Sequence, residues 1–470
     1  MKKYHAMMVG LLVLVTILSQ PVWAGWQKAS IGTVTNWAFG IAIGPGRNDG
    51  INRVYVASWS RLYEFTWNGS SWDRVDIGPT LGWEVALGCG RNDGLVRVYC
   101  TFTVTGPQYG GVYEFTWDGS SWVRQTVCTF PSSPSSSAGH GIAVGPGRND
   151  GINRVYACDC NNNRTFESTW DGSSWNTVQA IPDWSGTEFL IGSGRSDNVA
   201  RVYIAYIGGQ LREYSWTGSG WTYVNIDPAS SSYYDVWIGA GRNDGRNRVY
   251  SGDGRFGSYS LVEFNWNGTN WDKTTIGPMP NLPNCITVGP GRNDLLNRVY
   301  SGTTGGTRFA LEYTWNNTTW DSTWVDAAGT SGVAYCDAIA AKARNDGIDR
   351  LYITSSDSNI YEFIYTTEVA QENLATPPTD AILKVYPNPF RQSLGIRLSA
   401  LAKEEISLKI YDISGRCVRT LISNQSLKSK TQSLSWDGKD DFAQELPNGV
   451  YYVNLVSKNY RLSKTVVLTK

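Results

Sequence analysis

The sequence predicts an all-β protein, a seven-bladed β-propeller followed by a small Ig-like β-sandwich. Three observations predict this fold. The 470 residues include 50 Gly, 21 Trp and 26 Tyr and show little helical 3.6-residue patterning, which is typical of short strands and tight turns. A four-residue signature recurs seven times between strand-like segments. The last part of the chain lacks this signature and alternates apolar and polar residues, as strands of a sandwich do.

The first 24 residues have the pattern of a secretory signal peptide. Met1-Lys2-Lys3 precedes an apolar stretch over residues 7–18, and a polar segment ends at Ala24. A membrane-spanning helix needs ~20 apolar residues, and neither this stretch nor any later one is that long. We therefore expect cleavage after Ala24 and no membrane span in the exported chain.

Composition argues against several functions. The 41 basic and 41 acidic residues cancel, so no basic surface for nucleic acid or anionic lipid is expected. His140 is the only histidine after the signal peptide and no Cys-x-x-Cys motif occurs, so we predict no metal site, no cofactor and no His-Ser-Asp catalytic set. The eight cysteines include Cys158 and Cys160, which are too close to pair comfortably, and we expect structural or free thiols.

The signature Gly46-Arg47-Asn48-Asp49 defines the repeat of residues 25–365. Its arginine recurs, at intervals of roughly 44 to 57 residues, at Arg47, Arg91, Arg148, Arg195, Arg242, Arg292 and Arg344. Each copy predicts four strands, and Asn-Gly or Asp-Gly pairs supply the positive φ angles of a tight hairpin. Four antiparallel strands at this period indicate a propeller blade.

The ends of the array predict how the ring closes. The last repeat stops after its third strand, residues 360–363. Residues 26–32 stand alone before the first repeat and resemble a fourth strand such as residues 72–78. We expect the N-terminal segment to complete the seventh blade, which would remove the exposed strand edges of an open array.

Four charged positions recur in every copy, represented by Arg47, Asp49, Arg53 and Glu64. Arginine forks match carboxylates, so the pattern favours an ion-pair network within each blade over seven equivalent ligand sites. The turn at residues 42–50 resembles the FG-GAP repeats of integrin-type propellers, and that resemblance implies the fold. Arginine and proline replace the family's calcium ligands, so it does not imply calcium binding.

The loops on the two faces of the predicted ring differ in how well their sequences repeat. The loops on one face are nearly identical from copy to copy, and those on the other face vary. Variable loops suit a single asymmetric binding site. Aromatic side chains occur on this side at Trp59, Trp83, Tyr109, Trp184, Tyr233, Tyr234 and Tyr335. They could stack on sugar rings or bind a peptide. The alternative is that they only pack beneath the loops.

Carboxylates occur where the innermost strands enter the central channel, at Glu84, Glu188, Asp235 and Asp337. Such residues commonly bond to backbone amides and water. A pair of them held about 5 to 9.5 Å apart would suit a polysaccharide-acting enzyme.

The C-terminal part follows a polar, proline-bearing linker, residues 366–380. Residues 381–470 contain Tyr386-Pro387-Asn388-Pro389-Phe390, Trp436-Asp437-Gly438 and Asn448-Gly449-Val450-Tyr451. In combination these motifs resemble the type A C-terminal sorting domain of the type IX secretion system. The resemblance implies export across both membranes through that machinery to the medium or the outer cell surface, but it does not indicate an activity.

The sequence favours a non-catalytic surface protein that binds a glycan or matrix polymer through its variable face. Two alternatives remain, a propeller enzyme acting on polysaccharide and a surface scaffold. Pocket shape separates the three hypotheses.

Overall fold

A computed structural model gives the fold of the chain. It describes residues 25–103, 110–131, 139–181, 186, 188–206, 209–228, 232–255, 258–303, 310–326, 338–366, 382–399, 405–412, 417–426, 431–441, 444–457 and 461–469. The predicted signal peptide (1–24) and almost all of the predicted linker (366–380) lie outside these residues. The chain forms two compact units, and the second begins after residue 367.

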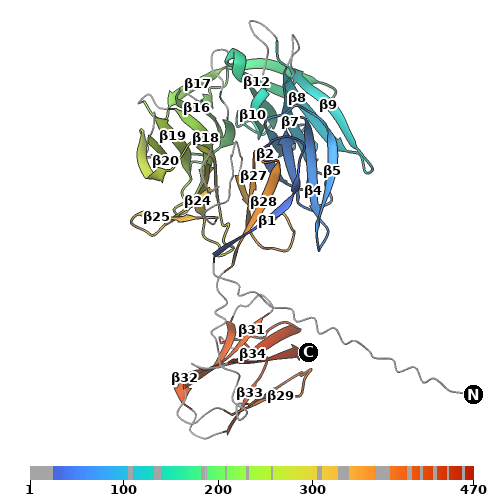
Figure 1. Ribbon diagram of the computed structural model, residues 1–470, viewed down its shortest axis with the longest axis vertical. Helices are drawn as coiled ribbons and strands as arrows, with labels where there is room; N and C mark the ends of the chain where they lie inside the picture. The colour runs from blue at the N-terminus through green and yellow to red at the C-terminus, as the bar shows by residue number, and fades with distance from the viewer. Residues whose placement is uncertain are drawn as a thin grey trace, which may run out of the picture. The chain divides into compact units, whose positions relative to one another are not determined.

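The first unit is a ring of seven four-stranded antiparallel sheets, which confirms the predicted propeller (Figure 1). Blade 1 comprises β2 (Ala38–Gly44), β3 (Arg53–Ser58), β4 (Arg61–Trp67) and β5 (Trp72–Pro79). Blade 2 comprises β6 (Val85–Gly88), β7 (Arg97–Phe102), β8 (Gly111–Trp117) and β9 (Trp122–Thr129). Blade 3 comprises β10 (Gly139–Gly145), β11 (Arg154–Asp159), β12 (Arg164–Trp170) and β13 (Trp175–Ile181), with a short 3-10 helix at Cys160–Asn162.

The remaining blades repeat this order. Blade 4 comprises β14 (Glu188–Gly192), β15 (Arg201–Ala205), β16 (Leu211–Trp216) and β17 (Trp221–Asn225). Blade 5 comprises β18 (Tyr233–Gly239), β19 (Arg248–Arg255), β20 (Ser258–Trp266) and β21 (Trp271–Met279). Blade 6 comprises β22 (Pro283–Gly289), β23 (Arg298–Thr303), β24 (Ala310–Trp315) and β25 (Trp320–Trp324). Blade 7 comprises β26 (Ala338–Ala341), β27 (Arg350–Thr354), β28 (Asn359–Thr366) and β1 (Gly25–Thr33).

The N-terminal strand closes the ring, as the sequence predicts. β1 pairs antiparallel with β28, from Gly25 opposite Thr366 to Thr33 opposite Asn359, and Figure 1 draws the two strands side by side. The first and last strands of the propeller are thereby joined in one sheet, in which β28 is paired on both sides and β1 is the outermost strand, as β5 is in blade 1.

Two faces follow from the strand order. The face that carries the signature turns, between the first and second strands, and the turns between the third and fourth strands is called the turn face below. The opposite face, with the connections between blades and the loops between second and third strands, is called the variable face.

The second strand of each blade lies at the centre of the packing. All six residues of β3 are buried, whereas the outer strand β5 exposes four successive residues, Asp73 to Asp76. A tyrosine in the middle of each second strand is fully or almost fully buried, at Tyr55, Tyr99, Tyr156, Tyr203, Tyr250, Tyr300 and Tyr352. Each blade thus packs its flat faces on its neighbours.

The signature turn has backbone reasons for its residue types. A Cβ atom at Gly46 would lie 2.6 Å from the hydroxyl oxygen of Tyr55, so a side chain there would have to displace the tyrosine, and six of the seven copies have glycine at this position while the seventh has Ala343. Asn48 follows in the left-handed region, with φ 60°, which asparagine tolerates better than most residues.

The side chain of the signature asparagine also forms hydrogen bonds to the next blade, a contact that the sequence did not predict. The Asn48 side chain donates from Nδ2 to the carbonyl of Val96 at 2.9 Å and accepts from the amide of Val96 at 2.7 Å. Asn345 of blade 7 donates to the carbonyl of Asn52 and accepts from its amide in the same way, which links the last blade to the first. These bonds join the signature turns of neighbouring blades on the turn face.

Blade 4 forms fewer of these hydrogen bonds to the next blade, because Ser196 replaces the asparagine. Its hydroxyl only accepts from the amide of Asn247, at 3.2 Å, and its φ is 59°. We expect Ser196→Asn to raise the free energy of unfolding by about 0.5–1.5 kcal/mol through the added bond and the better backbone fit. Denaturant unfolding checks this, with Asn48→Ser as the matched reverse change, which should destabilise by a similar amount. Equal stability of Ser196→Asn and the original chain would contradict a stabilising role for the hydrogen bonds of the signature asparagine.

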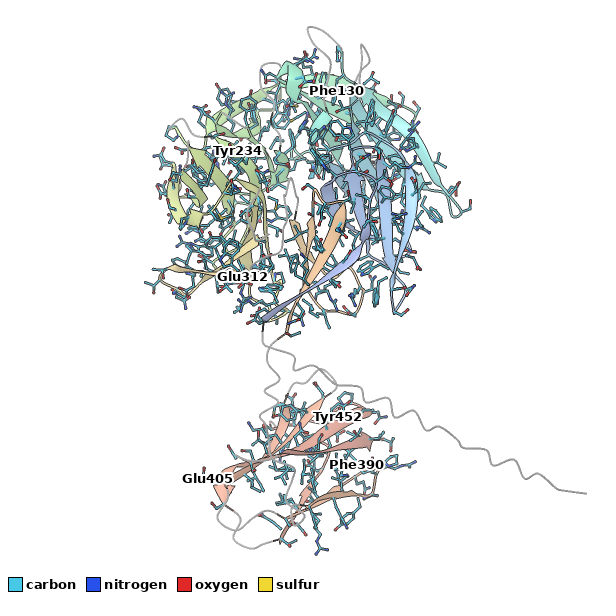
Figure 2. All side chains as sticks on the ribbon, in the orientation of Figure 1. Phe130, Tyr234, Glu312, Phe390, Glu405 and Tyr452 are labelled. Atoms are coloured by element: carbon cyan, nitrogen blue, oxygen red, sulfur yellow. The ribbon has the colours of Figure 1, made fainter. Side chains whose placement is uncertain are left out.

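The second unit is a two-sheet sandwich. One sheet contains β29 (Ile382–Tyr386), β30 (Leu394–Ser399) and β33 (Thr431–Trp436). The other contains β32 (Cys417–Ser426), β31 (Glu405–Asp412), β34 (Gly449–Ser457) and β35 (Arg461–Leu468). Phe390 and Trp436, both 1% exposed, pack in the core between the sheets, and Figure 2 shows Phe390 among them. The side chain of Asn388 binds the backbone of Thr465 and Val467, so the Tyr-Pro-Asn-Pro-Phe motif fastens to β35.

Two further predictions can be compared with the described residues. The seven cysteines among them are all free thiols, Cys158 and Cys160 included. None of the described residues forms a helix long and apolar enough to cross a membrane.

Candidate functional site

The repeated charges bind one another inside each blade. In blade 1 the Glu64 carboxylate is fully buried and accepts hydrogen bonds from Arg47 Nε at 3.0 Å and from the Tyr55 hydroxyl at 3.2 Å. Arg53 donates from its two terminal guanidinium nitrogens to the two carboxylate oxygens of Asp49, at 2.8 and 2.7 Å. The predicted network between the first turn and the third strand is therefore present.

The exposed carboxylate of this network has a lowered pKa. Asp49 is 39% exposed at its side chain, and the hydrogen bonds from Arg53 lower the pKa of its carboxyl to about 2. Because both oxygens of Asp49 accept from Arg53, this carboxylate is occupied within its own blade.

The signature arginine also stacks on the following blade. The guanidinium carbon of Arg47 lies 3.8 Å from the ring centroid of Trp117. The seven such pairs, all at 3.7–4.0 Å, are Arg47–Trp117, Arg91–Trp170, Arg148–Trp216, Arg195–Trp266, Arg242–Trp315, Arg292–Tyr365 and Arg344–Trp67. The signature therefore holds each blade internally and holds it to its neighbour.

A second aromatic contact repeats at every junction. The buried tyrosine of one blade meets the fourth-strand tryptophan of the next edge to face, as Tyr55 meets Trp122 at 5.9 Å and 87°. Tyr300 and Trp26 form the same contact, so β1 takes the place of an ordinary fourth strand. The repeated residues thus account for assembly of the ring.

The variable face carries an aromatic cluster that does not repeat. It consists of Trp37, Phe39, Trp59, Trp83 and His140, and is called the aromatic platform below. Phe39 is 5% exposed and lies beneath, with its ring 4.3 Å from Trp83 and 6.0 Å from Trp59. Trp59 stands at 85° to Trp83 with centroids 5.1 Å apart.

Two indoles of the platform face solvent. Trp37 is 50% exposed and Trp59 is 40% exposed, although large aromatic side chains usually pack inside. The amide of Trp59 donates to the carbonyl of Trp37, and the amide of Gly40 donates to the carbonyl of Trp83, so backbone bonds fix the supporting loops. The result is an aromatic surface built from blades 1 to 3, in which the Trp37 and Trp59 indoles are exposed.

His140 extends the platform on blade 3. Its ring stacks on Trp83, with centroids 4.4 Å apart and an interplanar angle of 20°. Burial lowers the pKa of His140 to about 4, so the imidazole is neutral at physiological pH and behaves as another aromatic surface.

This pKa predicts a pH dependence of stability. Unfolded His140 takes up a proton near pH 6.5, whereas the folded residue stays neutral down to about pH 4, so its contribution is complete above 6.5 and is lost as pH falls toward 4. The free energy of unfolding should fall by at most about 1.4 kcal/mol per pH unit across this window. Denaturant unfolding at pH 7, 5.5 and 4.5 checks this, and His140→Phe should flatten the profile. An identical slope in both proteins would contradict it.

Sequence reasoning found only part of the platform. It named Trp59 and Trp83, which the structure brings together, and missed Trp37 and Phe39. Both missed residues flank the start of the innermost strand of blade 1, and their position beside a variable-face loop was the available signal.

The other predicted aromatics lie elsewhere. Tyr233 is fully buried, its hydroxyl donates to the Asp227 carboxylate, and it accepts from Lys273 Nζ at 3.1 Å, so its ring is inside blade 5 rather than on the face. Tyr234 is half-buried and its ring covers Gly254; Figure 2 labels it on the same blade. Tyr109, Trp184 and Tyr335 lie outside the described residues.

Two of the predicted channel carboxylates bind backbone amides. Asp235 accepts from the amides of Val236 and of Ile286 in the next blade. Glu84 Oε1 accepts from the amide of Val85 at 3.0 Å. Glu188 is half-buried at the start of β14, and Asp337 lies outside the described residues. Among the residues that the structure describes, no group of three or more His, Cys, Asp or Glu side chains is placed to hold a metal ion.

Comparison with known proteins identifies the second unit. Residues 384–469 match the family model of the secretion system C-terminal sorting domain, which confirms the resemblance seen in the motifs. This domain directs export through the type IX secretion machinery, and the protein is secreted or located on the cell surface. No curated protein matches the chain.

Several solved structures resemble the chain at low identity. PorZ, a surface component of the type IX secretion system of Porphyromonas gingivalis, is 12% identical over 94% of this chain and 75% of its own, with a TM-score of 0.36. YCF48 from Cyanidioschyzon merolae is 12% identical over 73% and 99%, with a TM-score of 0.45. Aleuria aurantia lectin, solved with α-methyl-L-fucoside, is 20% identical over 63% and 98%, with a TM-score of 0.37.

Proposed function

We propose that this secreted or surface propeller is a non-catalytic binding protein for glycan, and that the aromatic platform is its contact surface. The observation that carries the proposal is the pair of exposed indoles, Trp37 and Trp59, held over buried Phe39. Sugar rings present apolar C–H faces that stack on such indoles, while their hydroxyl groups stay in water.

Polar groups beside the platform suit the hydroxyl groups of a neutral sugar. Asn36 donates from Nδ2 to the Ser60 hydroxyl at 3.4 Å, and the Tyr63 hydroxyl donates to Thr35 Oγ1 at 2.8 Å. Thr35, Asn36 and Ser60 lie in the loops that carry Trp37 and Trp59, and the buried Tyr63 holds Thr35 in place. A few placed polar groups beside apolar surface are typical of sites that orient an uncharged ligand.

The contacts of two of the predicted carboxylates favour binding over catalysis. Glu84 and Asp235 each direct a carboxylate oxygen to the backbone amide of the following residue. A general acid or a nucleophile must present its oxygen to substrate instead. These contacts favour a role of both residues in fixing the inner strands.

A glycan array tests the proposal. The full chain should bind a defined group of glycans, and Trp37→Ala/Trp59→Ala should weaken binding at least about tenfold, because most of the stacking surface is removed. Tyr223→Ala, which truncates an aromatic side chain 49% exposed on β17, is the matched control and should bind as the original chain does. Absence of binding by the folded original chain, or equal losses in both variants, would contradict the proposal.

A further inference from the structure

The charges of the chain are unevenly distributed between its two units. Residues 381–470 contain 14 basic and 7 acidic side chains, whereas residues 25–365 contain 25 basic and 31 acidic side chains. The neutral total of the chain therefore includes a distinctly basic sorting domain. A partner that binds this domain gains affinity and specificity from negative charge.

Two of these cations lie directly opposite each other on the three-stranded sheet. Lys384 of β29 pairs with Arg397 of β30, and both side chains are exposed on the outer face, because the alternate residues Leu383, Ile396 and Leu398 are buried in the core. Neither cation forms an ion pair with a residue that the structure describes. Like charges in directly opposed positions destabilise a sheet. Such a local conflict is typical of a functional site, and an anion from outside the domain would relieve it.

Exposed apolar side chains flank the two cations. Tyr386 is 58% exposed at the end of β29, opposite Gly395. A Cβ atom at Gly395 would lie 3.2 Å from Cε2 of Tyr386, so the tyrosine ring extends over the neighbouring strand. Ile382, on the other side of Lys384 in the same strand, is 41% exposed. The face thus combines positive charge with an aromatic and an aliphatic contact surface.

The third strand of the sheet adds a row of hydroxyl groups. Thr431, Ser433 and Ser435 are exposed on β33, and Ser433 lies opposite Arg397. These short side chains leave the two cations and the tyrosine accessible and offer hydrogen bonds beside them. The docking face is defined here as the outer residues of this sheet, Ile382, Lys384, Tyr386, Arg397, Thr431, Ser433 and Ser435.

This composition fits a protein partner better than a lipid surface. Tyrosine and arginine are enriched among the residues that contribute most to protein interfaces, whereas attraction to anionic lipid typically uses clusters of four to eight basic residues. The domain directs export through the type IX machinery, so that machinery has to contact it. We propose that the docking face binds an acidic segment of a protein of the type IX secretion machinery, with carboxylates on Lys384 and Arg397 and an apolar side chain against Tyr386.

Arg397→Glu separates this role from a structural one. The change turns a like-charge pair into an opposite-charge pair, so the melting temperature of the purified full chain should stay the same or rise. It also places a negative charge on the docking face, so export from cells that carry the type IX machinery should fall at least about tenfold, with the chain retained in the periplasm. Lys409→Glu, on β31 of the other sheet, makes the same change in net charge and is the matched control. It should be exported as the original chain is.

A photoreactive cross-linking residue at Ser433 identifies the partner in the same cells. We expect a cross-link from the full chain to an Asp- and Glu-rich peptide of a machinery protein, and loss of this product in Arg397→Glu. The same residue at Thr465, exposed on β35 of the other sheet, is the control and should not give it.

Four results would overturn the proposal. They are normal export of Arg397→Glu, an equal loss of export in Lys409→Glu, a cross-linked machinery peptide without acidic residues, and cross-links only to lipopolysaccharide or to a second copy of the chain. The aromatic platform belongs to the propeller, so a failure of this proposal leaves the glycan proposal standing, and the reverse holds as well.

Discussion

Glu312→Gln is expected to lower the free energy of unfolding by about 3 kcal/mol, although it changes one atom. The Glu312 carboxylate is 1% exposed in β24 (Figure 2), accepts from Arg292 Nε at 2.8 Å, and lies 3.9 Å from Arg298 Nε. The amide keeps the shape but leaves two guanidinium groups beside a neutral partner, and breaking a buried ion pair from one side is strongly destabilising. Guanidinium unfolding followed by circular dichroism measures the loss.

Asp294→Asn in the same blade is the matched control. Its carboxylate also pairs with Arg298, at 2.6 Å, but is 40% exposed, so solvent screens the pair. We expect a loss below about 1 kcal/mol. Equal losses in the two variants would contradict the view that the buried glutamate organises each blade.

Removal of β1 is expected to open the ring. A chain that starts at Val34 lacks the eight residues that pair with β28 and the Trp26 ring that packs on Tyr300 and Tyr365 at 5.9 and 5.3 Å. It exposes the edge of β28, so we expect aggregation and a melting temperature lower by more than about 10 °C. Thermal unfolding and light scattering measure both effects.

The control for this deletion is the chain that starts at Gly25, which keeps β1 and should remain monodisperse, whatever its oligomeric state. If the chain that starts at Val34 behaves in the same way, closure by β1 contributes little to the stability of the ring.

The architecture was predictable because every repeat encodes it locally. The charge pattern of Arg47, Asp49, Arg53 and Glu64 recurs seven times beside strand-like segments, and Asp-Gly occupies the signature turn in five of the seven copies, so the copies support the same interpretation. Ring closure was also predictable from the sequence, because residues 26–32 resemble the fourth strand of another blade.

Contacts between blades were harder to predict. Asn48 binds Val96, and Arg47 stacks on Trp117, in both cases across a junction that no local pattern marks. The aromatic platform was also only partly predictable, because Trp59, Trp83 and His140 come from three blades and meet only when the ring forms. Channel carboxylates such as Asp235 gave no sequence signal of their backbone partners.

These contacts divide the propeller into two functional parts. The repeated residues assemble the ring, and the residues that do not repeat form the aromatic platform on the variable face. The most direct test is a nuclear magnetic resonance titration of the full chain, labelled with ¹⁵N at tryptophan, with a glycan that binds on the array. Trp37→Phe and Trp59→Phe assign the two platform indoles. Our account predicts that their signals shift on binding while those of the junction residues Trp117 and Trp170 stay in place, and shifts confined to the junction residues would contradict it.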